Sequence, residues 1–209
     1  MKTKGIESLT GYGKYWTYHV NVVPKAARQR LYEACKHLVD KEKKDTKVFG
    51  KPGKEQRYTG FYRKEKGEFT YSGVKQVASG DYPAELLELE GYACKELPQL
   101  LREGAPNASL INYYPDGAHM VGEHSDKDGR EDPILSFSLG AERDFLYREQ
   151  DKKVKHSRVT MEDGSMLVMW PGFQERYWHV VPKQLKVKRG RINVTQRHHR
   201  ATTRNTKAL

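Results

Sequence analysis

Two segments of the chain place apolar residues at helical spacing. The spacing over residues 23–41 predicts one helix, and the spacing over residues 81–102 predicts a second. Asp81 is a candidate N-cap of the second helix, and Pro83 suits its first turn. Pro98 should kink this helix or end it early, because proline has no amide donor for the helical hydrogen bond.

Two aromatic runs between these helices predict a β-hairpin. They are residues 57–63 (RYTGFYR) and residues 68–73 (EFTYSG). Aromatic residues and threonine favour extended backbone on a half-buried surface. The linking residues 64–67 end on Gly67, which suits the turn between the two predicted strands.

The chain after Gly104 consists largely of short β-branched or aromatic runs. Loops or Asp-Gly and Pro-Gly signals separate most of them, with no helical pattern in between. The runs are residues 108–114, 119–126, 133–140, 143–149, 155–161, 165–170, 177–182 and 191–197. Closely spaced strands of this kind indicate a sandwich or barrel rather than a parallel α/β sheet. We therefore expect an α+β protein with helices on one side of a jelly-roll-like double sheet.

Basic residues are concentrated in two parts of a chain whose net charge is +11. Residues 183–209 hold nine Lys or Arg and no acidic residue. Residues 41–66 interleave Lys and Arg with aromatic residues, namely Phe49, Tyr58, Phe61 and Tyr62. Cations mixed with aromatic rings suit phosphate neutralisation and base stacking, so we expect a nucleic-acid partner. A solvated basic face without a partner is the alternative.

Length and cysteine usage indicate an intracellular protein with one domain over residues 1–209. The length suffices for one core and is short for two. Cys35 and Cys94 lack CxxC spacing and are expected to be reduced thiols. The first ten residues contain no apolar signal region, and no stretch is long enough to span a membrane. We expect a soluble monomer, nuclear if the source is eukaryotic and otherwise cytoplasmic.

His124-Ser125-Asp126 is a candidate for two ligands of one metal ion. In a strand, residues i and i+2 point to the same face, so this imidazole and this carboxylate can converge. Two histidines and one carboxylate on one face of a metal are typical of non-haem Fe(II) oxygenases. Candidates for the third ligand are His156, His179, His198 and His199. We favour His179 because apolar residues flank it; histidines on the surface would be the alternative explanation of the pattern.

The last predicted strand, residues 191–197, alternates polar and apolar positions. Arg191, Thr195 and Arg197 share one face of the strand. Two inward-pointing guanidiniums in a small barrel are unfavourable unless they meet an anion. A dicarboxylate co-substrate would supply both charges, one on a guanidinium and the other beside the metal. An exposed edge strand would explain one of the two arginines more readily than both.

Several motifs in consistent order resemble the AlkB family of nucleic-acid dealkylases. The resemblance runs from about residue 46 onward and is carried by residues 110–117 (LINYYPDG), 124–128 (HSDKD), 133–140 (PILSFSLG), 143–145 (RDF), 164–169 (GSMLVM), 178–182 (WHVVP) and 191–197 (RINVTQR). Within the family the chain is most similar to the eukaryotic DNA-repair branch, through residues 48–51 (VFGK) and 69–73 (FTYSG).

This resemblance implies a fold and a reaction. The implied fold is a double-stranded β-helix core at about residues 105–200, with flanking helices and a nucleotide-recognition hairpin at about residues 46–75. The implied reaction uses Fe(II), 2-oxoglutarate and O2 to oxidise N-alkyl groups on nucleic-acid bases of the 1-methyladenine and 3-methylcytosine type. The alkyl carbon leaves as an aldehyde, which restores the base.

The resemblance also implies residue roles. The implied iron ligands are His124, Asp126 and His179, and the implied 2-oxoglutarate contacts are Asn112, Tyr114, Arg191, Thr195 and Arg197. The implied substrate contacts are Phe49 as a wedge in the duplex, Phe69 and Tyr71 as a stacking platform, Ser72 as a pocket hydroxyl and Asp128 near a cationic flipped base. Ordinary core packing could also explain the three aromatic residues.

The chain departs from that branch at three places. The platform has Phe-Thr-Tyr in place of Tyr-Thr-Phe, and Gln196 replaces an aromatic residue. A Pro-Arg dipeptide after Val-Phe-Gly is missing, and Arg57 is a candidate substitute. These departures concern the substrate rather than the chemistry. The alternatives are therefore an RNA demethylase, a 2-oxoglutarate oxygenase acting on protein or a small molecule, and an inactive nucleic-acid-binding module.

Overall fold

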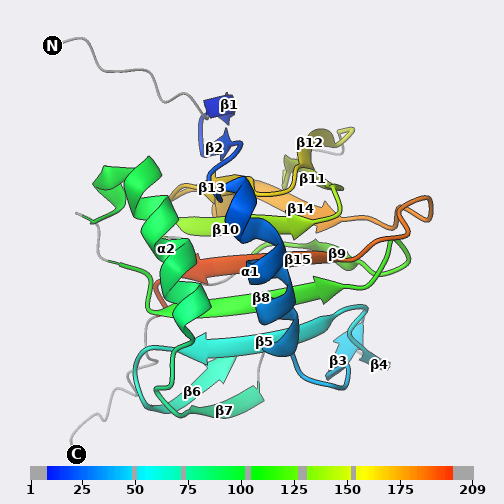
Figure 1. Ribbon diagram of the computed structural model, residues 1–209. Helices are drawn as coiled ribbons and strands as arrows, with labels where there is room; N and C mark the ends of the chain where they lie inside the picture. The colour runs from blue at the N-terminus through cyan, green and yellow to red at the C-terminus, as the bar shows by residue number, and fades with distance from the viewer. Residues whose placement is uncertain are drawn as a thin grey trace, which may run out of the picture.

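The computed structural model describes residues 9–48, 51–71, 74–101, 105–126, 131–151 and 154–199. Its largest element is a seven-stranded antiparallel sheet in the order β1-β2-β13-β10-β15-β8-β5 (Figure 1). In that order the strands are β1 (Leu9–Gly13), β2 (Trp16–His19), β13 (Met166–Met169), β10 (Ile134–Gly140), β15 (Arg191–Arg197), β8 (Ala108–Tyr114) and β5 (Tyr58–Arg63).

A second antiparallel sheet has four strands in the order β12-β11-β14-β9. These strands are β12 (Ser157–Met161), β11 (Arg143–Glu149), β14 (Tyr177–Val181) and β9 (Val121–His124). Apolar side chains from both sheets form one buried cluster, in which Ile134 of β10 and Phe145 of β11 take part. The two sheets therefore enclose a common interior, and the expected jelly-roll-like architecture is confirmed.

Helices α1 (Lys25–His37) and α2 (Ala84–Glu96) cover one face of the seven-stranded sheet (Figure 1). Leu31 of α1 and Leu86 of α2 are fully buried in the same apolar cluster as Ile192 and Val194 of β15. Because side chains alternate along a strand, Arg191, Asn193, Thr195 and Arg197 of β15 face the opposite way, into the space between the sheets. The helix-facing core thus determines which residues of β15 line the interior.

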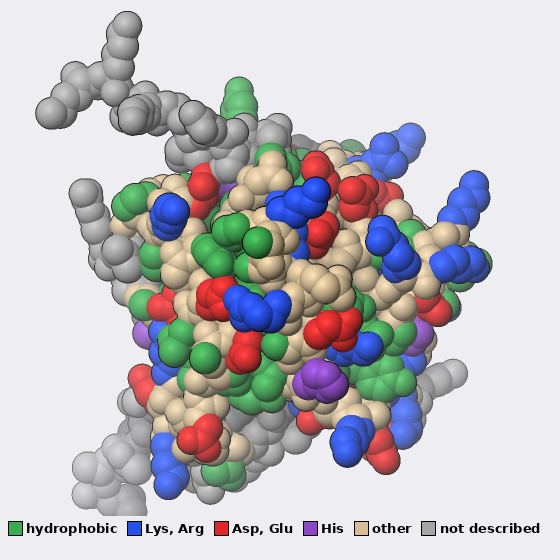
Figure 2. All heavy atoms as spheres, viewed as in Figure 1, with side chains coloured by type: hydrophobic (Ala, Val, Ile, Leu, Met, Phe, Trp, Pro, Cys, Tyr) green, Lys and Arg blue, Asp and Glu red, His purple; other side chains and the backbone are tan. Residues whose placement is uncertain are grey.

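Charges are mixed on the face that carries α1 and α2. Figure 2 shows Lys and Arg side chains interspersed with Asp and Glu over the described residues of this face. Arg30 and Glu88, for example, form an ion pair at 2.6 Å between α1 and α2. Among the described residues, every helix is too short or too polar to cross a bilayer.

Both predicted helices are present, but each is shorter than predicted. The first predicted helix is α1, and the second is α2, followed by a 3-10 turn, η1 (Pro98–Leu101). Pro98 does end α2 early, as expected. The prediction for Asp81 was wrong, because Pro83 occupies the N-cap position and no side chain caps the helix.

The predicted hairpin between residues 57–63 and 68–73 is wrong in its pairing. β5 instead pairs with β8 and extends the large sheet, while β6 (Gly67–Tyr71) pairs with β7 (Val74–Ala78). A Cβ atom on Gly60 of β5 would lie 2.3 Å from the carbonyl oxygen of Leu38. Glycine therefore allows β5 to approach the residue that follows α1. The sequence patterns also missed β1, β2, a short pair of strands formed by β3 (Asp45–Val48) and β4 (Lys51–Lys54), and the short helix α3 (Phe173–Arg176).

Candidate metal centre and its pocket

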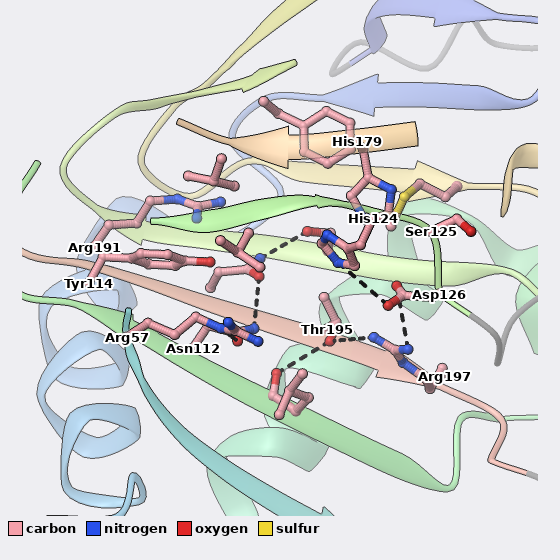
Figure 3. A pocket seen from close by; sticks show the side chains of 17 residues that line it. Arg57, Asn112, Tyr114, His124, Ser125, Asp126, His179, Arg191, Thr195 and Arg197 are labelled. Carbon is pink, nitrogen blue, oxygen red and sulfur yellow. Dashed lines mark hydrogen bonds and ion pairs between the residues drawn. The ribbon is translucent and has the colours of Figure 1, made fainter. Parts of the chain in front are cut away.

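A pocket of about 310 Å³ opens between the two sheets. Its walls come from β8, β10 and β15 on one side and from β9, β11 and β14 on the other. Figure 3 shows His124, Asp126 and His179 pointing toward one another in this pocket, with Arg197 beside Asp126. Arg191 lies farther along the pocket, next to Tyr114 (Figure 3).

Strand pairing brings the three predicted ligands together. His124 at the end of β9 lies directly opposite His179 of β14, and their ring centroids are 4.3 Å apart. Asp126 follows two residues later, with its Oδ1 3.7 Å from Nε2 of His124. One donor atom from each residue lies within 4.8 Å of the other two. The rejected candidate His156 instead contacts Glu123 at 2.8 Å.

The two imidazoles are held in different ways. Nδ1 of His124 donates to the carbonyl oxygen of Gly122 at 2.8 Å, so the neutral ring offers the lone pair of Nε2, which lies 3.7 Å from Oδ1 of Asp126, to a metal. The ring of His179 is stacked on Phe145, with centroids 5.3 Å apart. Buried Nδ1 of His179 has no hydrogen-bond partner among the described residues. These rings are suited to ligation as neutral imidazoles.

The electrostatics of the cluster favour ligand-ready protonation states. Burial, together with the nearby His124, lowers the pKa of His179 to about 3. Burial pushes the pKa of Asp126 upward, but the charge of Arg197 and the two histidines outweigh it, so the net pKa lies below its usual value. A neutral imidazole and an ionised carboxylate are the forms that bind a metal.

Acid should destabilise the metal-free protein through its buried histidines. The pKa of His179 is about 3 and burial also lowers that of His19, while imidazoles in the unfolded chain titrate near about 6.5. The unfolded chain therefore binds more protons in this window, and stability is full above the unfolded pKa and falls as the pH drops toward the folded one. At about pH 5, His179 should lower the free energy of unfolding by up to about 2 kcal/mol.

Denaturant unfolding of the metal-free protein at about pH 7.5 and about pH 5 measures this loss. The variant His179→Phe keeps a ring against Phe145 but removes the titrating group. It should therefore lose less stability on acidification than the wild type. Equal losses in the two proteins would contradict the assignment of the pH dependence to His179.

Arg191 places a guanidinium with unsatisfied hydrogen-bond donors in the pocket. It is 2% exposed, and its Nη2 donates to the hydroxyl oxygen of Ser138 at 2.8 Å. Its Nε and Nη1 are buried without a hydrogen-bond partner among the described residues. Burial lowers the pKa of Arg191 to about 10, against the opposing effect of Tyr114. Buried donors without partners are unfavourable, so this end of the pocket is suited to an anion.

Arg197, which like Arg191 lies on β15, contacts the metal cluster. Its Nη1 lies 3.4 Å from Oδ2 of Asp126, and its Nη2 donates to Oγ1 of Thr195 at 3.0 Å. Two guanidiniums thus face the interior from β15, as the alternation of residues 191–197 predicted. The alternative of an exposed edge strand is excluded, because β15 lies between β10 and β8.

A chain of three side-chain hydrogen bonds links residues that line the pocket. Arg57 Nε donates to Oδ1 of Asn112 at 2.6 Å, and Asn112 Nδ2 donates to Oδ1 of Asn193 at 3.3 Å. Asn193 Nδ2 in turn donates to Oγ of Ser136 at 2.9 Å. Sequence reasoning assigned no site role to Ser136 or Ser138, although two serines alternating with apolar residues in a buried strand were a usable signal.

The predicted substrate contacts are only partly described. Phe49, Ser72 and Asp128 lie outside the described residues. Phe69 and Tyr71 lie two positions apart in β6, opposite Gln76 and Val74 of β7. These roles therefore stay predictions.

Comparison with known proteins defines the class. A family model of the 2OG-Fe(II) oxygenase superfamily matches residues 16–197, and the chain belongs to this superfamily. Fe(II) and 2-oxoglutarate are the cofactors of that class, as expected. A solved structure of OsALKBH1 superimposes with a TM-score of 0.67 at 20% identity, over 91% of this chain and 100% of that chain, and so shares its fold.

The relatives narrow the class to AlkB homologues. The DNA oxidative demethylase ALKBH2 of Mus musculus is 33% identical over 72% of this chain and 64% of its own length. ALKBH2 of Homo sapiens is 38% identical over 44% of this chain and 39% of its own length. The DNA N(6)-methyladenine demethylase ALKBH1C of Arabidopsis thaliana is 29% identical over 65% of this chain and 30% of its own length. These matches span less than two thirds of each relative, and they confirm the AlkB resemblance.

Proposed function

We propose that this protein oxidatively removes alkyl groups from N-alkylated bases in DNA. The observation that carries the proposal is the convergence of His124, Asp126 and His179 beside two buried guanidiniums, Arg191 and Arg197. Relatives named as DNA oxidative demethylases support DNA as the substrate. The basic stretches at residues 41–66 and 183–209 support binding to a phosphate backbone.

In this proposal the histidines and Asp126 hold Fe(II), and β8 and β15 hold 2-oxoglutarate. Arg191 receives one carboxylate on its two unpaired buried donors, which an anion would satisfy. Arg197 neutralises negative charge beside the metal ligands. The remaining contacts to the co-substrate come from Asn112, Tyr114 and Thr195, which line the same pocket.

Bound Fe(II), 2-oxoglutarate and O2 would together supply the oxidation of the N-alkyl carbon, after which the aldehyde is released and the base is restored. The protein itself orients the bound groups and encloses the site. Tyr114 is 2% exposed, and the guanidinium of Arg191 lies 5.5 Å from its ring centroid, which fixes both groups. The ring of Phe145 covers His179 from the apolar side and helps keep water from the ligand cluster.

A base stacked in a duplex cannot reach a pocket between two sheets, so the substrate base must be flipped out. We propose that residues 46–75 form the recognition region for that base, within a catalytic domain spanning residues 1–209. Phe69 and Tyr71 would stack on the flipped base, with Ser72 beside it, and Phe49 would fill the gap that the base leaves in the duplex. Phe69 and Tyr71 stand two positions apart in the sequence, the spacing that suits one shared face of an extended strand.

The proposal is tested by anaerobic reconstitution with Fe(II), followed by formaldehyde release from methylated oligonucleotides after 2-oxoglutarate and O2 are added. We expect release from DNA that contains 1-methyladenine or 3-methylcytosine. Faster release from matched RNA would indicate an RNA demethylase. Decarboxylation of 2-oxoglutarate with no oxidised nucleic acid would indicate a protein or small-molecule substrate. No decarboxylation under any condition would indicate an inactive binding module.

Asp128 should select cationic bases. Methylation at adenine N1 or cytosine N3 makes the base positive, and a nearby carboxylate stabilises that charge. Asp128→Asn should therefore lower kcat/KM on 1-methyladenine and 3-methylcytosine by about tenfold or more, and have less effect on a neutral lesion. Rates on oligonucleotides that differ only in the lesion measure the effect. Equal losses on cationic and neutral lesions would remove Asp128 from this role.

A further inference from the structure

Gln174 contacts the backbone of a predicted metal ligand from a distant part of the chain. It lies in α3 and is 1% exposed. Its Oε1 accepts a hydrogen bond from the backbone amide of Asp126 at 2.9 Å, and its Nε2 donates to Sδ of Met169 at 3.4 Å. The side-chain amide thus has a partner at both ends and a defined orientation. A buried glutamine with these contacts can act on the metal cluster without touching a metal.

The helix that carries Gln174 is itself held by Gln150, the residue directly after β11. The backbone amide of Gln150 donates to the carbonyl oxygen of Arg176 at 2.9 Å. Its Nε2 donates to the carbonyl oxygens of Gln174 at 2.9 Å and Tyr177 at 3.1 Å. The last carbonyls of a helix have no partner within the helix, so Gln150 supplies what a four-residue helix cannot. α3 is therefore a defined turn rather than a loose connection.

This turn connects two of the three predicted ligands. β14 begins at Tyr177, directly after α3, and carries His179 two residues later. Asp126 is joined to the same turn through Gln174. The position of Asp126 relative to His179 thus depends on this short element as well as on the pairing of β9 with β14, although the two residues are far apart in the sequence.

Asp126 also has a competing partner. Its Oδ2 lies 3.4 Å from Nη1 of Arg197, while its Oδ1 lies 3.7 Å from Nε2 of His124. A carboxylate beside a guanidinium gains from rotating into a two-point contact. The hydrogen bond from the Asp126 amide to Gln174 fixes the backbone position from which the carboxylate reaches both partners. Without it, the backbone would be free to shift and the carboxylate would move from the histidines toward Arg197.

We propose that Gln174, held by Gln150, is a positioning residue that sets the carboxylate of Asp126 against His124 and His179 for metal binding. The inference rests on the proposed function, because it assumes that these three residues bind the metal.

The test is an anaerobic titration of the metal-free chain with Mn(II), in which calorimetry measures the Mn(II) affinity. Gln174→Leu removes the acceptor for the Asp126 amide, and Gln174→Asn is too short to reach it. Both should weaken Mn(II) affinity by about tenfold or more, the range found for residues that orient metal ligands. Gln174→Glu keeps an acceptor at the same reach and should lower Mn(II) affinity less than either of these two variants.

Gln184→Leu is the matched control. Oε1 of Gln184 accepts from the backbone amide of Asp144 at 2.9 Å and from Nε of Arg143 at 3.0 Å, away from the metal cluster. This variant should lower thermal stability and leave Mn(II) affinity unchanged. Wild-type affinity in a folded Gln174→Leu or Gln174→Asn would overturn the inference alone. Failure of the wild-type chain to bind Mn(II) would overturn the metal site and, with it, this inference.

Discussion

Replacing His179 with alanine should abolish both turnover and metal binding in a chain that remains folded. His179 is 5% exposed, and its ring lies 4.3 Å from that of His124. Among the described residues, no other His, Cys, Asp or Glu joins this cluster. Residues that only orient a ligand cost about 10–100-fold in affinity, and removing a ligand should cost more. Mn(II) titration and formaldehyde release measure the two losses, and circular dichroism checks the fold.

His156→Ala is the matched control for this experiment. His156 was a candidate for the third ligand, but its Nε2 contacts Glu123 at 2.8 Å outside the cluster. It should retain metal affinity and most activity. Full activity in His179→Ala together with loss of activity in His156→Ala would show that the third ligand has been assigned to the wrong histidine.

Arg191→Lys should raise the KM for 2-oxoglutarate by about 10–100-fold, with a much smaller change in kcat. A lysine keeps the charge but replaces the planar fork with a single ammonium, and so cannot make the same two-point contact with a carboxylate. The two unpaired buried donors of Arg191 are the atoms that the substitution removes. Initial rates over a range of 2-oxoglutarate concentrations separate KM from kcat.

Arg143→Lys is a close control, because the guanidinium of Arg143 also lies beside Tyr114, 5.6 Å from the ring centroid. The protein itself satisfies that guanidinium, through the carbonyl oxygens of Asp116, His119 and Pro182 and the side chain of Gln184. Arg143→Lys should therefore lower stability and leave the KM for 2-oxoglutarate unchanged. The same KM shift in both variants would point to a general loosening of the pocket and against a co-substrate contact at Arg191.

Local patterns in the sequence were sufficient for the strands that build the site. The alternation of residues 191–195 predicted that Arg191 and Arg197 share a face, and β15 has that arrangement with Ile192 and Val194 on the helix side. His124 and Asp126 also converge, but β9 ends at His124, so Asp126 lies after the strand and alternation within one strand does not by itself place it. Period-two alternation is a property of extended backbone and needs no knowledge of the partner strands.

Contacts between distant segments determined the strand pairing and the hydrogen bonds that local patterns could not predict. The sequence left β5 free to pair with β6, but close packing of Gly60 behind α1 and the edge of β8 placed it in the large sheet. It held no signal that Gln174 would meet the amide of Asp126, because that hydrogen bond exists only once β9 and α3 lie side by side. Spacing along a chain determines which side chains share a face, whereas the contacts between distant segments depend on how their surfaces pack in the folded protein.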